Sequence, residues 1–192
     1  MDINAFFNAE FDEHTDVVRD TRAACAAGFA DLLAHCAQSI RHGGKIIFFG
    51  NGGSAADCQH LATELTIRYK TDRAPIAAIA LTTDTSALTA GGNDLGFENI
   101  FARQIDALGK PGDVAIGIST SGNSENVIRA LKTAQALGIV PAALSGKDGG
   151  RLVGIADPLI VVPSDTTARI QEMHITLGQM LCGALEIELG LV

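Results

Sequence analysis

Five short apolar segments constrain the fold of this chain more than any other feature. The first four of them alternate with segments of helical pattern. They are rich in Ile, Val, Phe and Ala and are bounded by Gly, Ser, Pro or Asp. Strands that alternate with helices along a chain indicate a parallel sheet covered by helices on both faces. The sequence therefore predicts an α/β fold with a doubly wound, five-stranded parallel sheet. The predicted strands are residues 45–50, 76–81, 113–119, 140–146 and 158–163.

The remaining segments predict helices and one main structural unit. Residues 1–42 have a helical pattern and an Ala-rich second half, and they predict two helices that meet near His14. This region carries no evident chemistry, so we interpret it as an N-terminal oligomerisation region. Residues 43–192 are expected to form a single unit that ends in a long helix over residues 167–189.

Charge and composition exclude several classes of function. The formal net charge is -8 and no basic run occurs, which argues against binding to nucleic acid or to an anionic membrane. The start of the chain is acidic, and no apolar stretch reaches about 18 residues. The four cysteines are widely spaced in apolar surroundings, as expected for buried thiols in a reducing compartment. We therefore expect a soluble, cytoplasmic protein.

Two polar loops follow predicted strands, at the edge where parallel sheets bind ligands. The glycines of the first loop let a ligand approach the backbone closely. The second loop offers four hydroxyls and backbone N–H groups at a helix start, which suits a phosphate, although the same residues could simply cap the helix. Neither loop matches a nucleotide-binding motif, so no nucleotide is expected. The loops are Asn51, Gly52, Gly53, Ser54 and Ser119, Thr120, Ser121, Gly122, Asn123, Ser124.

Two helices carry polar side chains beside these loops. His60 and Glu64 are four residues apart and share a helix face, where they could bind a metal, transfer a proton, or form an ordinary surface hydrogen bond. On the last helix, Gln171, His174 and Gln179 interrupt the apolar pattern. We expect them to line the same pocket; the alternative is that they form hydrogen bonds across a helix or subunit interface.

Four motifs in order resemble the phosphoheptose isomerases, also called sedoheptulose 7-phosphate isomerases, of the sugar isomerase (SIS) domain superfamily. The motifs are GNGGSAADCQHLATEL, LTTDTSALTAGGNDLGFENIFARQI, ISTSGNSENVIRAL and RIQEMHITLGQMLCGALE. The resemblance implies a five-stranded parallel sheet, a homotetramer with active sites at subunit boundaries, and a phosphosugar substrate. It also implies conversion of sedoheptulose 7-phosphate to D-glycero-D-manno-heptose 7-phosphate, which leads to the heptose of lipopolysaccharide.

The same resemblance assigns roles to individual residues. Glu64 would be the base that moves a proton between C1 and C2 through an enediol. The phosphate would be held by the second loop, assisted by the backbone near Gly53 and Ser54, and the sugar by polar side chains. The implied substrate-binding residues are Asn51, Gly52, Gly53, Ser54, Arg68, Asn93, Asp94, Ser119, Thr120, Ser121, Ser124 and Gln171.

One position departs from the family pattern. In the isomerases the residue at position 179 is usually a histidine that acts as the acid/base partner of the glutamate. In some members it binds zinc, one ion per subunit, with the equivalents of His60, Glu64 and Gln171. Here the residue is Gln179. An amide does not exchange a proton near neutral pH, and its oxygen is a poor zinc ligand, so both the acid/base role and the zinc site are weakened.

Three explanations are compatible with Gln179. The first is that the glutamine is a deliberate substitution. The second is a natural enzyme that uses water, His174 or the substrate for proton transfer. The third is that the chain is a non-catalytic binding protein. A binding relative, the protein that associates with the bacterial replication initiator, also lacks this histidine but lacks the glutamate as well. Retention of His60 and Glu64 therefore favours an isomerase. A phosphosugar-sensing regulator would usually add a basic DNA-binding segment, and the chain has none.

Overall fold

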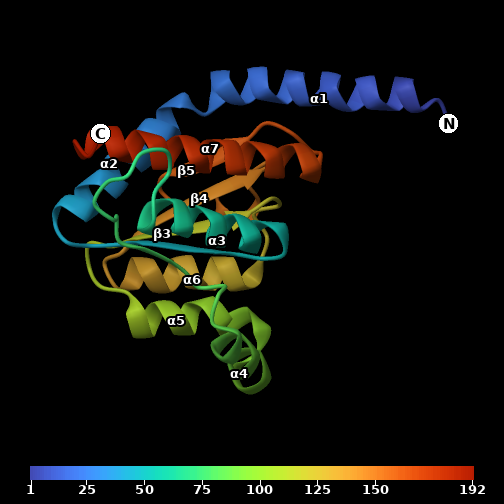
Figure 1. Cartoon of the computed structure of the whole chain (residues 1–192). Coiled ribbons are helices and arrows are strands. Elements are labelled where there is room, and N and C mark those ends of the chain that lie inside the picture. Colours follow the sequence, from blue (N-terminus) through green and yellow to red (C-terminus); the bar gives the residue numbers. More distant parts are fainter.

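A computed structural model describes residues 1–192, and its centre is one sheet of five parallel strands in the order β2-β1-β3-β4-β5 (Figure 1). Each strand lies within its predicted range, so the predicted doubly wound parallel sheet is confirmed. The strands are β1 (Ile46–Gly50), β2 (Ala78–Ala80), β3 (Val114–Ser119), β4 (Val140–Gly146) and β5 (Leu159–Val162).

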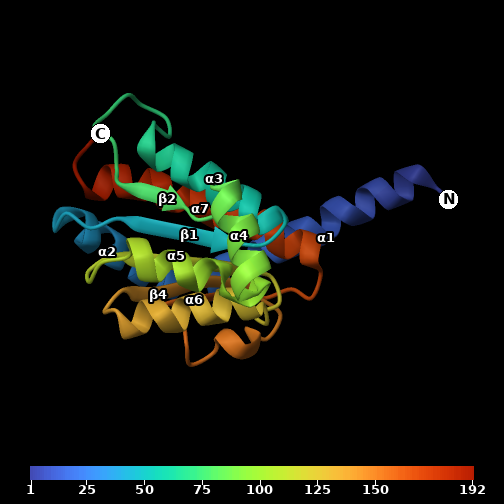
Figure 2. The ribbon, with the colours of Figure 1, turned by 90° about the horizontal axis from the view of Figure 1, so that it is seen from below.

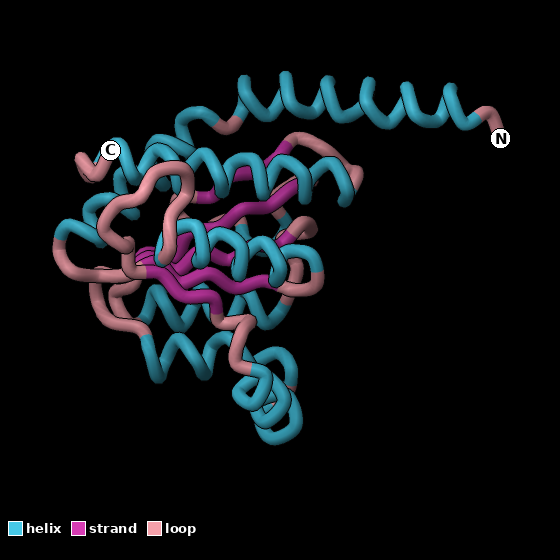
Figure 3. Tube along the Cα trace, viewed as in Figure 1, coloured by secondary structure: helices cyan, strands magenta, loops and turns pink.

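Helices cover both faces of the sheet, so that the strands lie between two apolar layers (Figure 3). Alternate residues of a strand point to opposite faces. Accordingly, Phe48 packs in the layer with α2, α3 and α7, whereas Phe49 packs in the layer with α5 and α6. The helices are α1 (Ile3–Ala24), α2 (Ala26–Arg41), α3 (Gly53–Thr66), α4 (Thr85–Leu95), α5 (Ile100–Leu108), α6 (Glu125–Ala136) and α7 (Thr167–Glu188), with short 3-10 turns at Phe97–Asn99 and Gly150–Leu152.

The two N-terminal helices meet at Cys25, so the predicted junction near His14 is wrong. Residues 3–24 contain no Gly or Pro to break a helix, and α1 begins cleanly because the Asp2 side chain accepts hydrogen bonds from two backbone N–H groups. The chain bends at buried Cys25, beyond which Leu32 of α2 enters the core. The N-terminal part of α1 instead projects beyond the body of the molecule, whereas its remainder lies along α7 (Figures 1 and 2).

Helix α4 was not predicted from the sequence. Asp84 caps it by accepting a hydrogen bond from Ala87 N at 2.9 Å, and none of its residues is buried. Two consecutive glycines, Gly91 and Gly92, weaken its helical propensity. The N-terminal cap was the one local signal that could have identified it.

Helices α3 and α7 approach each other closely. A Cβ atom built on Gly178 of α7 would lie 2.5 Å from Leu61 Cδ1 of α3, a separation that real Cβ atoms do not show. The missing side chain therefore permits the close packing that brings the outer faces of these two helices together. None of the helices combines the length and apolar character needed to cross a membrane.

Candidate active site

The candidate site lies where the carboxyl ends of β1 and β3 meet. These strands are neighbours, with Gly50 of β1 aligned with Ile118 of β3. From this edge, α3 continues on one face of the sheet and α6 on the other. In doubly wound sheets, the divergence of two such connections opens a crevice that binds ligands. The predicted position of both polar loops at one sheet edge is thereby confirmed.

The first loop reaches α3 without a side-chain cap. Gly52 adopts φ 57°, which favours glycine, and no side chain bonds to the first-turn N–H groups of α3. Gly53 lies against Gln171 of α7, because a Cβ atom at this position would stand 2.6 Å from Gln171 Nε2. Gln171 is therefore brought to the loop, as predicted, and the N-terminus of α3 remains free to face a ligand.

The second loop also leaves its helix uncapped. Ser124 occupies the N-cap position of α6 but makes no capping hydrogen bond. Its hydroxyl instead lies 3.0 Å from the hydroxyl of Ser119, which is 4% exposed. The structure thus shows no capping role for the Ser124 side chain, contrary to the alternative that these residues only cap the helix. The hydroxyls and the first turn of α6 present donors that suit an oxyanion.

Backbone contacts hold the second loop in place. Gly122 has φ 65° and lies so close to the carbonyl of Gly149 that no Cβ atom would fit between them. The side-chain amide of Asn123 is engaged in hydrogen bonds with the backbone. Its Nδ2 donates to Ser121 O at 2.9 Å within the loop, and its Oδ1 accepts from Arg151 N of the 3-10 turn at 3.2 Å. The loop conformation is therefore fixed by the chain itself.

A pair of amides joins the two loops. Asn51 Nδ2 donates to Asn126 Oδ1 at 2.9 Å, and Asn126 Nδ2 donates to Asn51 Oδ1 at 2.8 Å. Asn126 is 2% exposed, and its Oδ1 also accepts from Val127 N at 3.0 Å. Asn126 was not identified from the sequence. The signal for it was a polar side chain, poor in helix propensity, in the first turn of α6.

A second group of polar side chains lies where α3 and α7 meet. His60 Nε2 is 2.9 Å from Glu64 Oε1 and 3.3 Å from Gln179 Nε2. The His60 side chain is 46% exposed and that of Glu64 is 20% exposed. The predicted pairing of His60 with Glu64 is confirmed, and Gln179 joins it from α7. The group thus combines one carboxylate, one imidazole and one amide at a partly solvated surface.

These residues do not fit an ordinary zinc site. Zinc in proteins prefers thiolate, imidazole and carboxylate ligands. His60 and Glu64 provide two of these, but Gln171 and Gln179 provide only amides, and no three His, Cys, Asp or Glu side chains in the chain are grouped to hold a metal. The donor set is therefore weaker than that of an ordinary zinc site, and the zinc site stays a prediction.

His174 does not belong to the pocket where it was expected. Its side chain is fully buried, and its Nε2 lies 2.9 Å from Ser145 O at the end of β4. Burial lowers the pKa of His174 from 6.5 to about 4, so the ring is neutral near pH 7 and its Nε2 donates to the carbonyl. A buried neutral imidazole cannot replace the missing acid, and the explanation that relied on His174 is wrong.

Three other predicted residues are not brought to the loops within this chain. Arg68 lies exposed in the segment after α3 and makes no hydrogen bond. Asn93 and Asp94 are exposed near the end of α4, where Asn93 Nδ2 donates to Asp94 Oδ1 at 2.7 Å. Glu172, next to Gln171, turns towards α1 and lies 2.7 Å from His14 Nδ1. The roles assigned to Arg68, Asn93 and Asp94 therefore stay predictions.

Comparison with known proteins identifies close relatives over nearly the whole chain. A family model described as SIS domain matches residues 11–146. A phosphoheptose isomerase from Paramagnetospirillum magneticum is 56% identical over 186 residues, which are 97% of each chain. The structure of a phosphoheptose isomerase from Neisseria gonorrhoeae is 42% identical with a TM-score of 0.90, covering 96% of this chain and 99% of that one. A phosphoheptose isomerase structure from Francisella tularensis gives 34% identity and a TM-score of 0.94, with 97% and 100% covered.

The buried neutral His174 gives a prediction for stability. Because its folded pKa is lowered to about 4 from 6.5, the unfolded state binds a proton first as the pH falls. His174 should therefore reduce the free energy of unfolding by about 2 kcal/mol between pH 7.5 and pH 5. Urea unfolding at both pH values should give a smaller pH dependence for His174→Gln, whose amide keeps a donor for Ser145 O.

The control for this measurement is His42→Gln, which changes an exposed histidine at the end of α2. This variant should keep the pH dependence of the wild type. If His174→Gln and the wild type lose stability equally between the two pH values, His174 is not neutral in the folded protein.

Proposed function

The chain belongs to the phosphoheptose isomerases of the SIS domain family, and on that basis we propose that it converts sedoheptulose 7-phosphate to D-glycero-D-manno-heptose 7-phosphate. As a member of this family it is an aldose-ketose isomerase that acts on a phosphosugar. The observation that supports a phosphorylated substrate is the pair of helix N-termini without side-chain caps, α3 and α6, which follow the adjacent strands β1 and β3. We further propose that the reaction takes place in the cytoplasm and supplies heptose for lipopolysaccharide.

The phosphate is held by the second loop. The hydroxyls of Ser119 and Ser124 already lie 3.0 Å apart, and the first turn of α6 directs N–H groups towards the same place. Thr120 and Ser121 add two hydroxyls, and Gly52, Gly53 and Ser54 add the backbone of the first loop. The net charge of -8 provides no long-range attraction for an anion. Recognition therefore depends on directed hydrogen bonds.

Glu64 moves the proton between the two carbons. Its carboxylate removes a proton from C1 of the ketose, the electron pair forms the C1–C2 double bond of the enediol, and the proton returns to C2. The hydroxyl proton at O1 must leave, and O2 must gain one, as the aldehyde forms. Gln179 cannot carry this second proton, so water in the partly exposed site does so. Gln171, Asn51, Arg68, Asn93 and Asp94 are assigned to the sugar hydroxyls.

Replacement of Gln179 by histidine tests this mechanism. Gln179→His should raise kcat for sedoheptulose 7-phosphate by roughly 10²- to 10⁴-fold, because it restores a group that exchanges protons near neutral pH. Formation of the aldose is followed by NMR, and the metal content of both proteins is recorded. Gln135→His on the exposed surface of α6 is the matched control and should not change kcat.

Glu64→Gln in the Gln179→His protein should abolish turnover but leave binding of the phosphosugar unchanged. Turnover by the Glu64→Gln variant would contradict the assignment of the base. If the wild type and Gln179→His are both inert while folded, this function is wrong, and a non-catalytic SIS-type binding protein becomes the better interpretation.

The phosphate assignment is tested by ligand protection. Sedoheptulose 7-phosphate should raise the melting temperature of the wild type but not that of the double variant Ser121→Ala, Ser124→Ala, because two hydroxyl donors are lost. Thr133→Ala, in the last turn of α6, should retain the full shift. Equal protection of the double variant and the wild type would show that the phosphate binds elsewhere.

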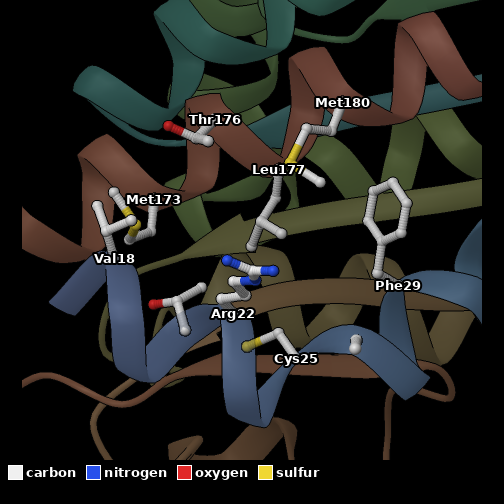
Figure 4. A pocket seen from close by; sticks show the side chains of 10 residues that line it. Val18, Arg22, Cys25, Phe29, Met173, Thr176, Leu177 and Met180 are labelled. Carbon is white, nitrogen blue, oxygen red and sulfur yellow. The ribbon is translucent and has the colours of Figure 1, made fainter.

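We also propose that copies of this chain assemble through α1, in the homotetramer that the family resemblance implies. Helix α1 projects from the body with its aromatic side chains in solvent, and Phe6, Phe7 and Phe11 are 51%, 60% and 58% exposed. Where the end of α1 and the start of α2 meet α7, there is a largely apolar groove of about 390 Å³ (Figure 4). Exposed apolar surface of this extent favours burial against a second copy.

The double variant Phe7→Ser, Phe11→Ser should reduce the oligomer mass, because it removes two of the largest exposed apolar side chains from α1. Light scattering during size-exclusion chromatography measures the mass. Phe97→Ser is the control, since Phe97 is 62% exposed on the 3-10 turn after α4 and should leave the mass unchanged. An unaltered mass in the double variant would argue against assembly through α1.

A further inference from the structure

The structure assigns a positioning role to Asn126, which we propose holds the two ligand-binding loops together as one preformed phosphosugar cradle. This inference rests on the proposed function for its substrate, whereas the contact itself is a property of the fold. Asn126 lies in the first turn of α6, and its partner Asn51 is the first residue of the other loop. The two residues are 75 positions apart in the sequence.

The contact between the two side chains is reciprocal. Each amide donates one hydrogen bond to the other and accepts one, at 2.8 and 2.9 Å. Only Asn or Gln side chains provide both a donor and an acceptor in the plane of one amide, so the geometry specifies the residue type. Because Asn126 is 2% exposed, water cannot readily replace the bonds that it makes.

Asn126 is itself held rigidly on α6. Its Oδ1 accepts a second hydrogen bond, from Val127 N at 3.0 Å, which ties the side chain to the first turn of the helix. This turn follows directly after Ser124, whose hydroxyl faces Ser119. Any displacement of the first loop is therefore transmitted to the group of donors proposed to hold the phosphate.

The amide pair also links structures that are otherwise attached to opposite faces of the sheet. Helix α3 packs in the layer with α2 and α7, and α6 packs in the layer with α5. At the carboxyl edge, the paired ends of β1 and β3 hold the starts of the two loops together, and beyond the sheet the amide pair joins them through side chains. The pair supplies that connection, so the cradle needs little ordering when a ligand binds.

The pair leaves Asn51 with one free N–H and one free lone pair, and it fixes their direction. Asn51 can thus contact a sugar hydroxyl only in the orientation that Asn126 imposes. Asn126 touches no substrate in this scheme and is a positioning residue rather than a catalytic one. Its loss should weaken binding equally in the ground state and the transition state, which raises KM but leaves kcat unchanged.

A double-mutant cycle with two readouts tests the inference. The first readout is hydrogen exchange of the loop amides, followed by mass spectrometry without ligand. Asn126→Ala should speed exchange in residues 50–54, and Asn51→Ala should speed exchange in residues 119–125, although each substitution lies on the other loop. Unchanged exchange in the opposite loop would overturn the proposal. Because Asn51 is only partly buried, Asn51→Ala remains informative if Asn126→Ala does not fold, and Asn126→Ser provides a further variant.

The second readout is kinetic and uses the Gln179→His protein, in which turnover is expected to be measurable. Asn126→Ala should raise KM for sedoheptulose 7-phosphate about tenfold with kcat unchanged, and it should add nothing to the effect of Asn51→Ala. Additive effects, or a KM that does not change, would overturn the positioning role. Gln135→Ala is the control for an amide lost elsewhere on α6.

The two hypotheses can fail separately. If wild type and Gln179→His neither bind nor convert sedoheptulose 7-phosphate, the proposed function fails, and the loop coupling is still decided by hydrogen exchange and by the affinity for inorganic phosphate. If the substrate is converted but the exchange of the opposite loop is unchanged, only the role of Asn126 fails.

Discussion

The rest of the site depends on the close contact between β1 and β3 at Gly50. A Cβ atom at this position would lie 2.8 Å from Ile118 O and 3.0 Å from the Cβ of Ser54, so the residue must be glycine. Its missing side chain lets the first turn of α3 fold back over the end of its own strand, next to the end of β3. The two polar loops thereby lie together at one edge of the sheet although their helices pack on opposite faces. The paired amides and the uncapped helix ends both follow from this arrangement.

The sequence was most informative about regular elements and least informative about side chains with several available partners. Continuous apolar runs of strand length predicted all five strands, because a strand buried on both faces must be apolar throughout. The junction of the first two helices was misplaced, since Cys25 gives no local signal for a bend, and the bend is determined by packing against the sheet. Helix α4 was missed because none of its residues is fully buried and only Leu88 packs at the edge of the core.

Polar residues on α7 show the same limit in the candidate site. Gln171 and Gln179 were expected to share a pocket with His174, and helical spacing alone cannot decide which side of the helix faces the sheet. In the structure, His174 bonds to Ser145 O in the core, while Gln171 contacts the first loop and Gln179 faces His60. Asn126 was overlooked because its importance depends on a partner 75 positions away. Tertiary contacts of this kind leave no trace in local spacing.

The amide pair has a further consequence for the chemical durability of the loop. Asn51 is followed by Gly52, the sequence in which deamidation is fastest, because glycine leaves the backbone nitrogen unhindered to attack the side-chain carbonyl carbon. That attack requires the asparagine side chain to rotate towards the following peptide. Here both atoms of the side-chain amide are bonded to Asn126, and the backbone carbonyl of Asn51 accepts a hydrogen bond from Ala55 N. The contact that joins the loops thus also restrains the side-chain rotation on which this reaction depends.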